Sequence, residues 1–180
     1  MNISGYVEIV RDSRQRTAGV FPLPDVAACV DYAITEAAET IDARLRAQRA
    51  GDKRNNGKEL DERREWGQAG YMIASALMQA TNWYDYGAGE NQLKVSLYLT
   101  LSWLANFVVS CDNDEDDSMA ALALAMSYWH TFCEYRQWDA AELLRETCVA
   151  FEAKHLTAWK YPVLSAEDAQ RQGERGEAAT

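Results

Sequence analysis

Residues 25–50 read DVAACVDYAITEAAETIDARLRAQRA, and this stretch decides the fold class of the chain. Asp25 stands where a helix N-cap belongs, and Gly51 follows the stretch as a stop signal. Between them, aliphatic residues recur every three or four positions, which is the period of a helix rather than that of a strand. This stripe consists of Val30, Ile34, Ala37, Ile41 and Leu45. We therefore predict one long helix that begins at Asp25 and ends at about Ala50.

The rest of the chain is also predicted to be helical. The three prolines are Pro22, Pro24 and Pro162, so the strongest helix breaker is absent between the last two. No alternating strand pattern with glycine-containing hairpin turns is evident. We expect further helices at about 3–16, 59–83 and 92–111, a fifth from the acidic turn 112–117 to about 136, and a sixth from Asp139 to about 160. The expected fold is an all-α helical bundle, a single domain over residues 1–162, followed by a flexible polar tail at 163–180.

Charge and composition restrict the class of protein. The 180 residues include 18 Lys+Arg and 28 Asp+Glu, a formal charge of −10, which argues against a nucleic-acid partner because phosphate binding needs a basic face. The longest uncharged stretch, 95–111, is too short for a typical membrane span. The first residues lack the pattern of a secretory signal. The four cysteines form no Cys-x-x-Cys pair, which is typical of buried thiols. We expect a cytoplasmic protein that binds neither nucleic acid nor a membrane.

Two acidic groups are candidates for chemistry. Glu36 and Glu39 are three residues apart, so their carboxylates share one face of the first long helix. The second group opens the helix predicted at 59–83. Its members are Glu59, Asp61, Glu62 and Glu65, followed by Gln68. Asp61, Glu65 and Gln68 share one face, whereas Glu62 lies nearer the apolar side. Taken alone, the first group is also typical of a solvated helix surface, and the second is also typical of acids that favour the first turns of a helix.

Together the two groups make a more specific pattern. Two helices joined by a short polar loop normally pack antiparallel, which would bring the two acidic groups opposite each other. Four or five carboxylates at one spot are tolerated only around a hard cation. Oxygen ligands suit Mg²⁺ or Mn²⁺. The pattern therefore indicates a metal site that could bind a polyphosphate and activate a water.

The spacing of these residues resembles that of a known family. Glu36-x-x-Glu39, an interval of 25 residues (40–64), and then Glu65-Trp-Gly-Gln68 before an apolar helix are similar to the MazG-like all-α nucleoside triphosphate pyrophosphohydrolases, which are related to the dimeric dUTPases. The resemblance covers about residues 25–84. It implies hydrolysis of a (deoxy)nucleoside triphosphate to monophosphate and pyrophosphate. It also implies that Glu36, Glu39 and Glu65 bind Mg²⁺ and deprotonate an attacking water, in a homo-oligomer (dimer or tetramer).

One position departs from the family pattern. The last acid of the family motif, an Asp, corresponds to Gln68, a neutral amide that binds Mg²⁺ more weakly and cannot accept a proton. Asp61 or Glu62 could replace the missing ligand, or Gln68 could bind through its carbonyl. Alternatively, Glu62-x-x-Glu65 is itself the second motif. In a further alternative the chain is catalytically inactive and is a helical interaction module that binds a basic partner through its acidic face.

Other residues are candidates for substrate or subunit contacts. The cations Lys53, Arg54 and Lys58 could contact phosphates, unless they belong simply to a solvated loop. Asn82, Tyr86 and Lys94 could contact a base or sugar, although aromatic residues at helix ends more often serve packing. The uncharged helix predicted at 92–111 carries more apolar surface than one small bundle easily hides, which predicts homo-oligomerisation. The residues concerned are Tyr98, Leu101, Trp103, Leu104 and Phe107.

Overall fold

The computed structural model describes residues 2–20, 22–50, 55–79, 96–110 and 115–158. Within these ranges the chain forms six α-helices and no strand, which confirms the predicted all-α fold. The helices are α1 (Ile3–Thr17), α2 (Val26–Ala50), α3 (Asn55–Leu77), α4 (Ser96–Ser110), α5 (Glu115–Tyr135) and α6 (Ala140–Ala158). The predicted tail at 163–180 lies outside the described residues.

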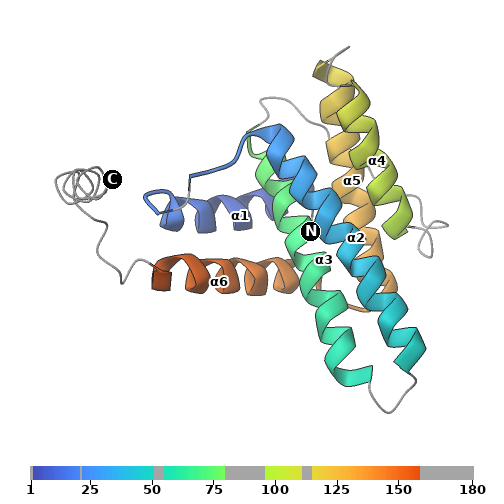
Figure 1. Cartoon of the computed structure of the whole chain (residues 1–180). Helices are drawn as coiled ribbons and strands as arrows, with labels where there is room; N and C mark the ends of the chain where they lie inside the picture. The colour runs from blue at the N-terminus through green and yellow to red at the C-terminus, as the bar shows by residue number, and fades with distance from the viewer. Residues whose placement is uncertain (1, 21, 51–54, 80–95, 111–114, 159–180) are drawn as a thin grey trace, which may run out of the picture.

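The helices are arranged in three pairs (Figure 1). α2 and α3 run side by side as an antiparallel pair, and α4 and α5 form a second pair beside them. α1 and α6 pack against each other and cross the first pair at a steep angle. α3 lies at the centre, because it contacts α1, α2, α5 and α6. The helix that carries the second acidic group is therefore covered on several sides.

Two predicted helix starts are confirmed by their caps. The Asp25 side chain accepts a hydrogen bond from the backbone N–H of Ala28 at 2.8 Å, at the start of α2. Asp139 accepts hydrogen bonds from the N–H groups of Ala141 and Glu142 at 2.9 and 3.0 Å, at the start of α6. These contacts satisfy N–H groups that have no partner within the helix.

Two tryptophans hold α3 against α5. The indole N–H of Trp66 donates to the backbone carbonyl of Trp129 at 3.2 Å, and the indole N–H of Trp129 donates to the carbonyl of Trp66 at 2.7 Å. Gly70 makes this possible, since a Cβ atom there would lie 2.2 Å from the Trp129 ring. The absence of a side chain at Gly70 therefore gives the Trp129 ring direct access to the backbone of α3.

The predicted apolar stripe of α2 is only partly buried. Val30 and Ala37 are buried, and Ile34 and Ile41 pack against the core. Leu45 is 42% exposed, so the stripe is not covered along its whole length. The last turns of α2 extend beyond the start of α4, so α4 accompanies only part of this long helix (Figure 1).

The apolar surface of α4 is divided between the core and the exterior. Leu104 and Phe107 are buried inside the chain, and Leu101 and Trp103 pack against the core. Tyr98 remains exposed, as do two valines near the end of the helix. Less apolar surface is therefore left over than the sequence indicated, and homo-oligomerisation stays a prediction. In the described part of the chain, no helix is both long and apolar enough to cross a membrane.

Candidate functional site

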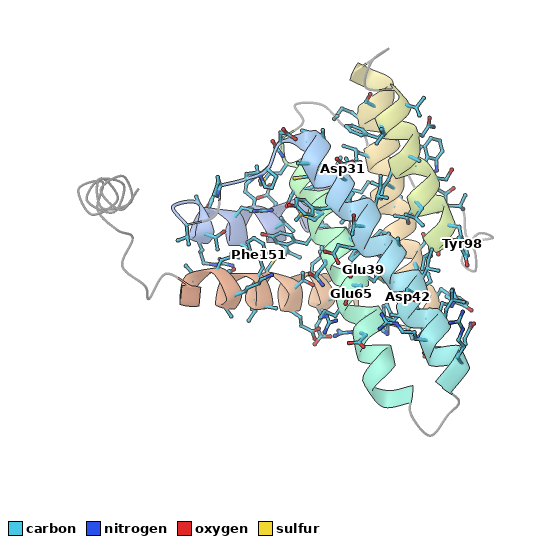
Figure 2. The ribbon with its side chains drawn as sticks, in the orientation of Figure 1. Asp31, Glu39, Asp42, Glu65, Tyr98 and Phe151 are labelled. Carbon is cyan, nitrogen blue, oxygen red and sulfur yellow. The ribbon has the colours of Figure 1, made fainter. Side chains whose placement is uncertain are left out.

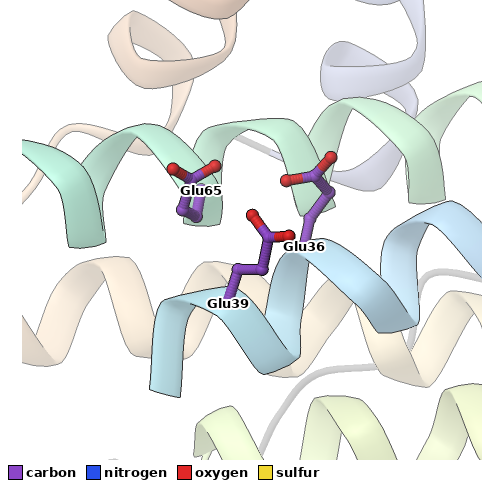
Figure 3. A group of neighbouring side chains, drawn as sticks. All are labelled: Glu36, Glu39 and Glu65. Carbon is purple, nitrogen blue, oxygen red and sulfur yellow. The ribbon is translucent and has the colours of Figure 1, made fainter. Parts of the chain in front are cut away.

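Three glutamates converge where α2 packs against α3 (Figure 3). Glu36 and Glu39 extend from α2 and Glu65 from α3, and one carboxylate oxygen of each lies within 4.8 Å of the others. Glu65 is buried, Glu36 is partly buried and Glu39 is exposed. Ala33 and Ala37, which are fully buried on α2, are small enough to allow a close approach between helices. The antiparallel packing therefore brings together three of the predicted metal ligands, which we call the carboxylate cluster.

The carboxylate cluster carries unfavourable charge repulsion. Burial raises the pKa of Glu36 to about 7, and the negative charges of Glu65 and Glu39 contribute in the same direction. A hydrogen bond with Glu65 adds to the increase, whereas the positive charge of Lys154 on α6 opposes it. Such a site favours either a proton or a cation between the carboxylates. Three converging carboxylate oxygens from two rigid helices fit a hard divalent cation.

Gln68 and Asp61 lie at the edge of the cluster and both connect to Glu65. The Gln68 side-chain N–H donates to Oε2 of Glu65 at 2.6 Å. Arg64 donates from Nε to Oε1 of Glu65 at 3.1 Å and also pairs with Asp61 at 3.3 Å. The predicted shared face of Asp61, Glu65 and Gln68 is thus present. In this arrangement Gln68 acts as a hydrogen-bond donor, so ligation through its carbonyl would require the amide to rotate.

Glu62 has a different environment from the cluster. Its side chain is buried, and Oε2 accepts a hydrogen bond from Nη2 of Arg136 at 2.9 Å. Arg136 follows the end of α5, so Glu62 is paired toward α5, whereas Glu65 is directed toward α2. Glu62 is not one of the three converging carboxylates. The structure therefore does not bring Glu62 to the site that the sequence predicted for it.

The predicted substrate contacts cannot be placed in this site. Lys53, Arg54, Asn82, Tyr86 and Lys94 lie outside the described residues. Lys58 belongs to α3, but its side chain is outside the described part of the structure.

A cavity of about 690 Å³ lies between α2, α3 and α6 and is lined by Glu36 of the carboxylate cluster. Tyr32 lines it from α2, one helical turn before Glu36. α3 contributes Arg63, Arg64, Gln68, Tyr71 and Met72, and the α6 side includes Glu146, Phe151, Lys154 and His155. This volume lies within the range of roughly 300–1,000 Å³ that is usual for small-molecule sites. The cavity therefore combines an acidic edge, several cations and an aromatic interior.

The contribution of α6 to this cavity was missed in the sequence. Phe151, Lys154 and His155 were assigned no role, because no local pattern shows that α6 covers α3. Gly67, inside the acidic motif, was the available signal. A Cβ atom there would lie 2.3 Å from Oγ1 of Thr147, so the two helices touch directly at this glycine.

Comparison of the chain with models of known protein families, with curated proteins and with solved structures finds no match. The resemblance to MazG-like enzymes therefore stays a prediction from the sequence, and the geometry around Glu36, Glu39 and Glu65 is the independent observation on function.

Proposed function

We propose that this chain hydrolyses a ribo- or deoxynucleoside triphosphate to the monophosphate and pyrophosphate in a reaction that depends on Mg²⁺ or Mn²⁺. The observation that carries the proposal is the convergence of Glu36, Glu39 and Glu65, whose oxygens lie within 4.8 Å of one another at the edge of a large cavity. The spacing of the same three residues in the sequence supports it.

Each member of the cluster has a stated role in this proposal. Glu36, Glu39 and Glu65 would hold the divalent cation, which supplies charge stabilisation for phosphate oxygens and lowers the pKa of a water. One of these carboxylates accepts the proton of the attacking water. Cleavage between the α- and β-phosphates then consumes one water and yields nucleoside monophosphate, pyrophosphate and a proton.

Two cations of the cavity are suited to the remaining phosphate charge. Arg64 and Lys154 line the same cavity as Glu36, from α3 and α6 respectively. Arg64 already pairs with Asp61 and Glu65, so a phosphate group would take the place of part of this interaction. Within the described part of the chain, Arg64 and Lys154 take the role of phosphate contacts that the sequence indicated for loop cations.

A second candidate function is supported by the hydrogen bonds of Glu65. Both of its oxygens already accept hydrogen bonds, from Arg64 and from Gln68, so part of the negative charge is balanced by the chain itself. This favours the alternative that the chain is an inactive helical module whose acidic surface binds a basic partner. Metal binding separates the two candidates, because only the enzyme requires it.

Product analysis tests the proposed reaction. The purified protein is incubated with Mg²⁺ or Mn²⁺ and a panel of ribo- and deoxynucleoside triphosphates, and pyrophosphate and phosphate are detected separately. We expect monophosphate and pyrophosphate, and we expect Glu36→Gln to abolish both products. Diphosphate with free phosphate would contradict the proposed reaction, and no turnover with either metal would favour the interaction module.

A further inference from the structure

We infer that the α6 side of the cavity and Tyr32 of α2 together form a binding site for the aromatic base of a nucleotide, next to the carboxylate cluster. This inference rests on the proposed function and adds to it the part of the substrate that is recognised. It assigns a role to α6, which lies outside the region that resembles MazG-like enzymes.

Three aromatic side chains form one continuous wall of the cavity. The rings of Phe151 and Tyr71 have centroids 4.9 Å apart and are tilted by 34°. The rings of Phe151 and His155 have centroids 4.3 Å apart and are tilted by 48°. All three side chains line the cavity, and we call them the aromatic wall. Tyr71 is only 2% exposed, so a planar base would stack on the ring surface that Phe151 and His155 present, whatever its pattern of donors and acceptors.

A buried cation, Arg14, contacts two rings of the aromatic wall. The guanidinium carbon of Arg14, on α1, lies 4.9 Å from the ring centroids of both Tyr71 and Phe151. Arg14 is only 5% exposed, and its Nη2 also donates to Oγ of Ser75 at 3.4 Å. Phe151 extends from α6 toward this α1 and α3 side (Figure 2). Because the rings are oriented before a ligand arrives, little entropy is lost when a base stacks on them.

The charge state of His155 agrees with this role. Burial lowers the pKa of the His155 imidazole, and the positive charges of Lys154 and Arg14 lower it further. The ring is therefore neutral at neutral pH, and a neutral imidazole can stack on a base without bringing a second charge into an apolar surface.

Tyr32 supplies an aromatic ring on the α2 side. It lines the cavity one turn before Glu36 and is 51% exposed, so it contributes little to the core. A ligand that fills the whole cavity needs two different ends. Its anionic end would contact the metal and the cations near Glu36, and its flat apolar end would contact the aromatic rings. A nucleoside triphosphate has both ends, whereas inorganic tripolyphosphate has only the first.

The test compares these two ligands by calorimetric titration in Mg²⁺. The probes are the non-hydrolysable α,β-methylene analogues of the four common deoxynucleoside triphosphates and inorganic tripolyphosphate. For Tyr32→Ala and Phe151→Leu we expect affinity for at least one analogue to fall by roughly 5- to 100-fold, as for the loss of one base–aromatic stack. Affinity for tripolyphosphate should stay unchanged. Tyr32→Phe, which keeps the ring, is the matched control and should bind like the wild type.

Several results would overturn the inference. One is wild-type binding of the analogues no tighter than of tripolyphosphate. Another is unchanged analogue affinity in both variants, and a third is an equal loss for both ligands, which would place the residues at the phosphate end. Since Tyr32 is half exposed, Tyr32→Ala keeps the test valid if Phe151→Leu fails to fold. The outcome is independent of turnover. If the wild type hydrolyses nucleotides but the variants bind the analogues as tightly as the wild type, only the base site is refuted. If the wild type binds the analogues more tightly than tripolyphosphate but releases no pyrophosphate, only the proposed reaction is refuted.

Discussion

Glu62 and Glu65 lie three residues apart on α3, and both are almost completely buried, at 2% and 7% exposed. Glu62 pairs with Arg136 at 2.9 Å, so its negative charge is balanced within the fold. Glu65 instead faces Glu36 and Glu39 of α2, and it pairs with Arg64. Burial, together with the negative charges of Glu65 and Glu39, raises the pKa of Glu36 to about 7.

This difference separates a structural ion pair from a candidate metal site on the same helix. A buried carboxylate is expensive unless a cation accompanies it. At Glu62 the fold itself supplies that cation. At the carboxylate cluster Arg64 pairs with Glu65, but Glu36 and Glu39 bring two further acids to the same place, and a divalent ion from solution would relieve the remaining repulsion. Burial alone therefore does not distinguish the two glutamates, but their neighbours do.

The largest expected effect is on metal binding. Wild-type protein should show a rise in melting temperature with added Mg²⁺ or Mn²⁺, because the cation binds the folded state selectively. Glu65→Gln should weaken metal affinity by more than about 100-fold, since even residues that only support metal ligands cost 10- to 100-fold. The rise in melting temperature should then disappear.

Glu62→Gln is the matched control for this experiment. It removes the same charge from a buried position three residues away on the same helix, yet it should retain the full metal response. Equal loss of the response in both variants would mean that the cations bind a diffuse acidic surface, and the distinction between the two glutamates would be wrong.

The next effect concerns the ion pair. Arg136→Met should lower the free energy of unfolding by about 3 kcal/mol, because it leaves the buried Glu62 carboxylate without its arginine. Urea denaturation measures this change, and the metal response should be preserved. The double variant Glu62→Leu/Arg136→Met should recover part of the loss. A single variant as stable as the wild type would show that Glu62 does not depend on Arg136.

The smallest effect concerns pH in the absence of metal. The pKa of Glu36 is raised in the folded state from an ordinary value of 4.5 to about 7. Its contribution to stability is therefore complete below about pH 4.5 and is lost as the pH rises through about 7, because the folded state must then hold a repelled carboxylate. After allowance for solvent screening we expect a loss of about 1 kcal/mol.

Urea denaturation in a chelator at several pH values between about 5 and about 7.5 measures this loss. Glu36→Gln cannot ionise, so its free energy of unfolding should fall less over the same interval, and the variant should be the more stable protein at the upper end. Identical pH profiles for wild type and variant would contradict the repulsion within the cluster.

The helices could be predicted because their signals are local. Asp25 and Asp139 cap the two helices that they were expected to open, with hydrogen bonds to residues two or three positions later. The end of α5 was predicted near its observed position although no glycine marks it. There Gln137 adopts a positive φ of 58°, and the N–H of Trp138 bonds to the carbonyl of Cys133 at 2.9 Å.

Predictions that depended on neighbouring helices were less accurate. The period of α2 placed Leu45 on the apolar stripe, but a period reports only which residues share a face. Whether that face is covered depends on the neighbouring helices, and Leu45 is 42% exposed. The same limit applies to Leu104 and Phe107, which α4 buries within the chain rather than exposing to a second copy.

By itself, the sequence determined that this protein is helical, where most helices begin and end, and which acids share a face, since these properties depend on residues within a few positions of one another. Only the tertiary structure decided that Glu65 meets Glu36 and Glu39 while Glu62 meets an arginine 74 residues away. It also decided that α6 completes the cavity. Such contacts are set by the packing of distant helices around α3, through Gly67 and Gly70, and no local spacing encodes them.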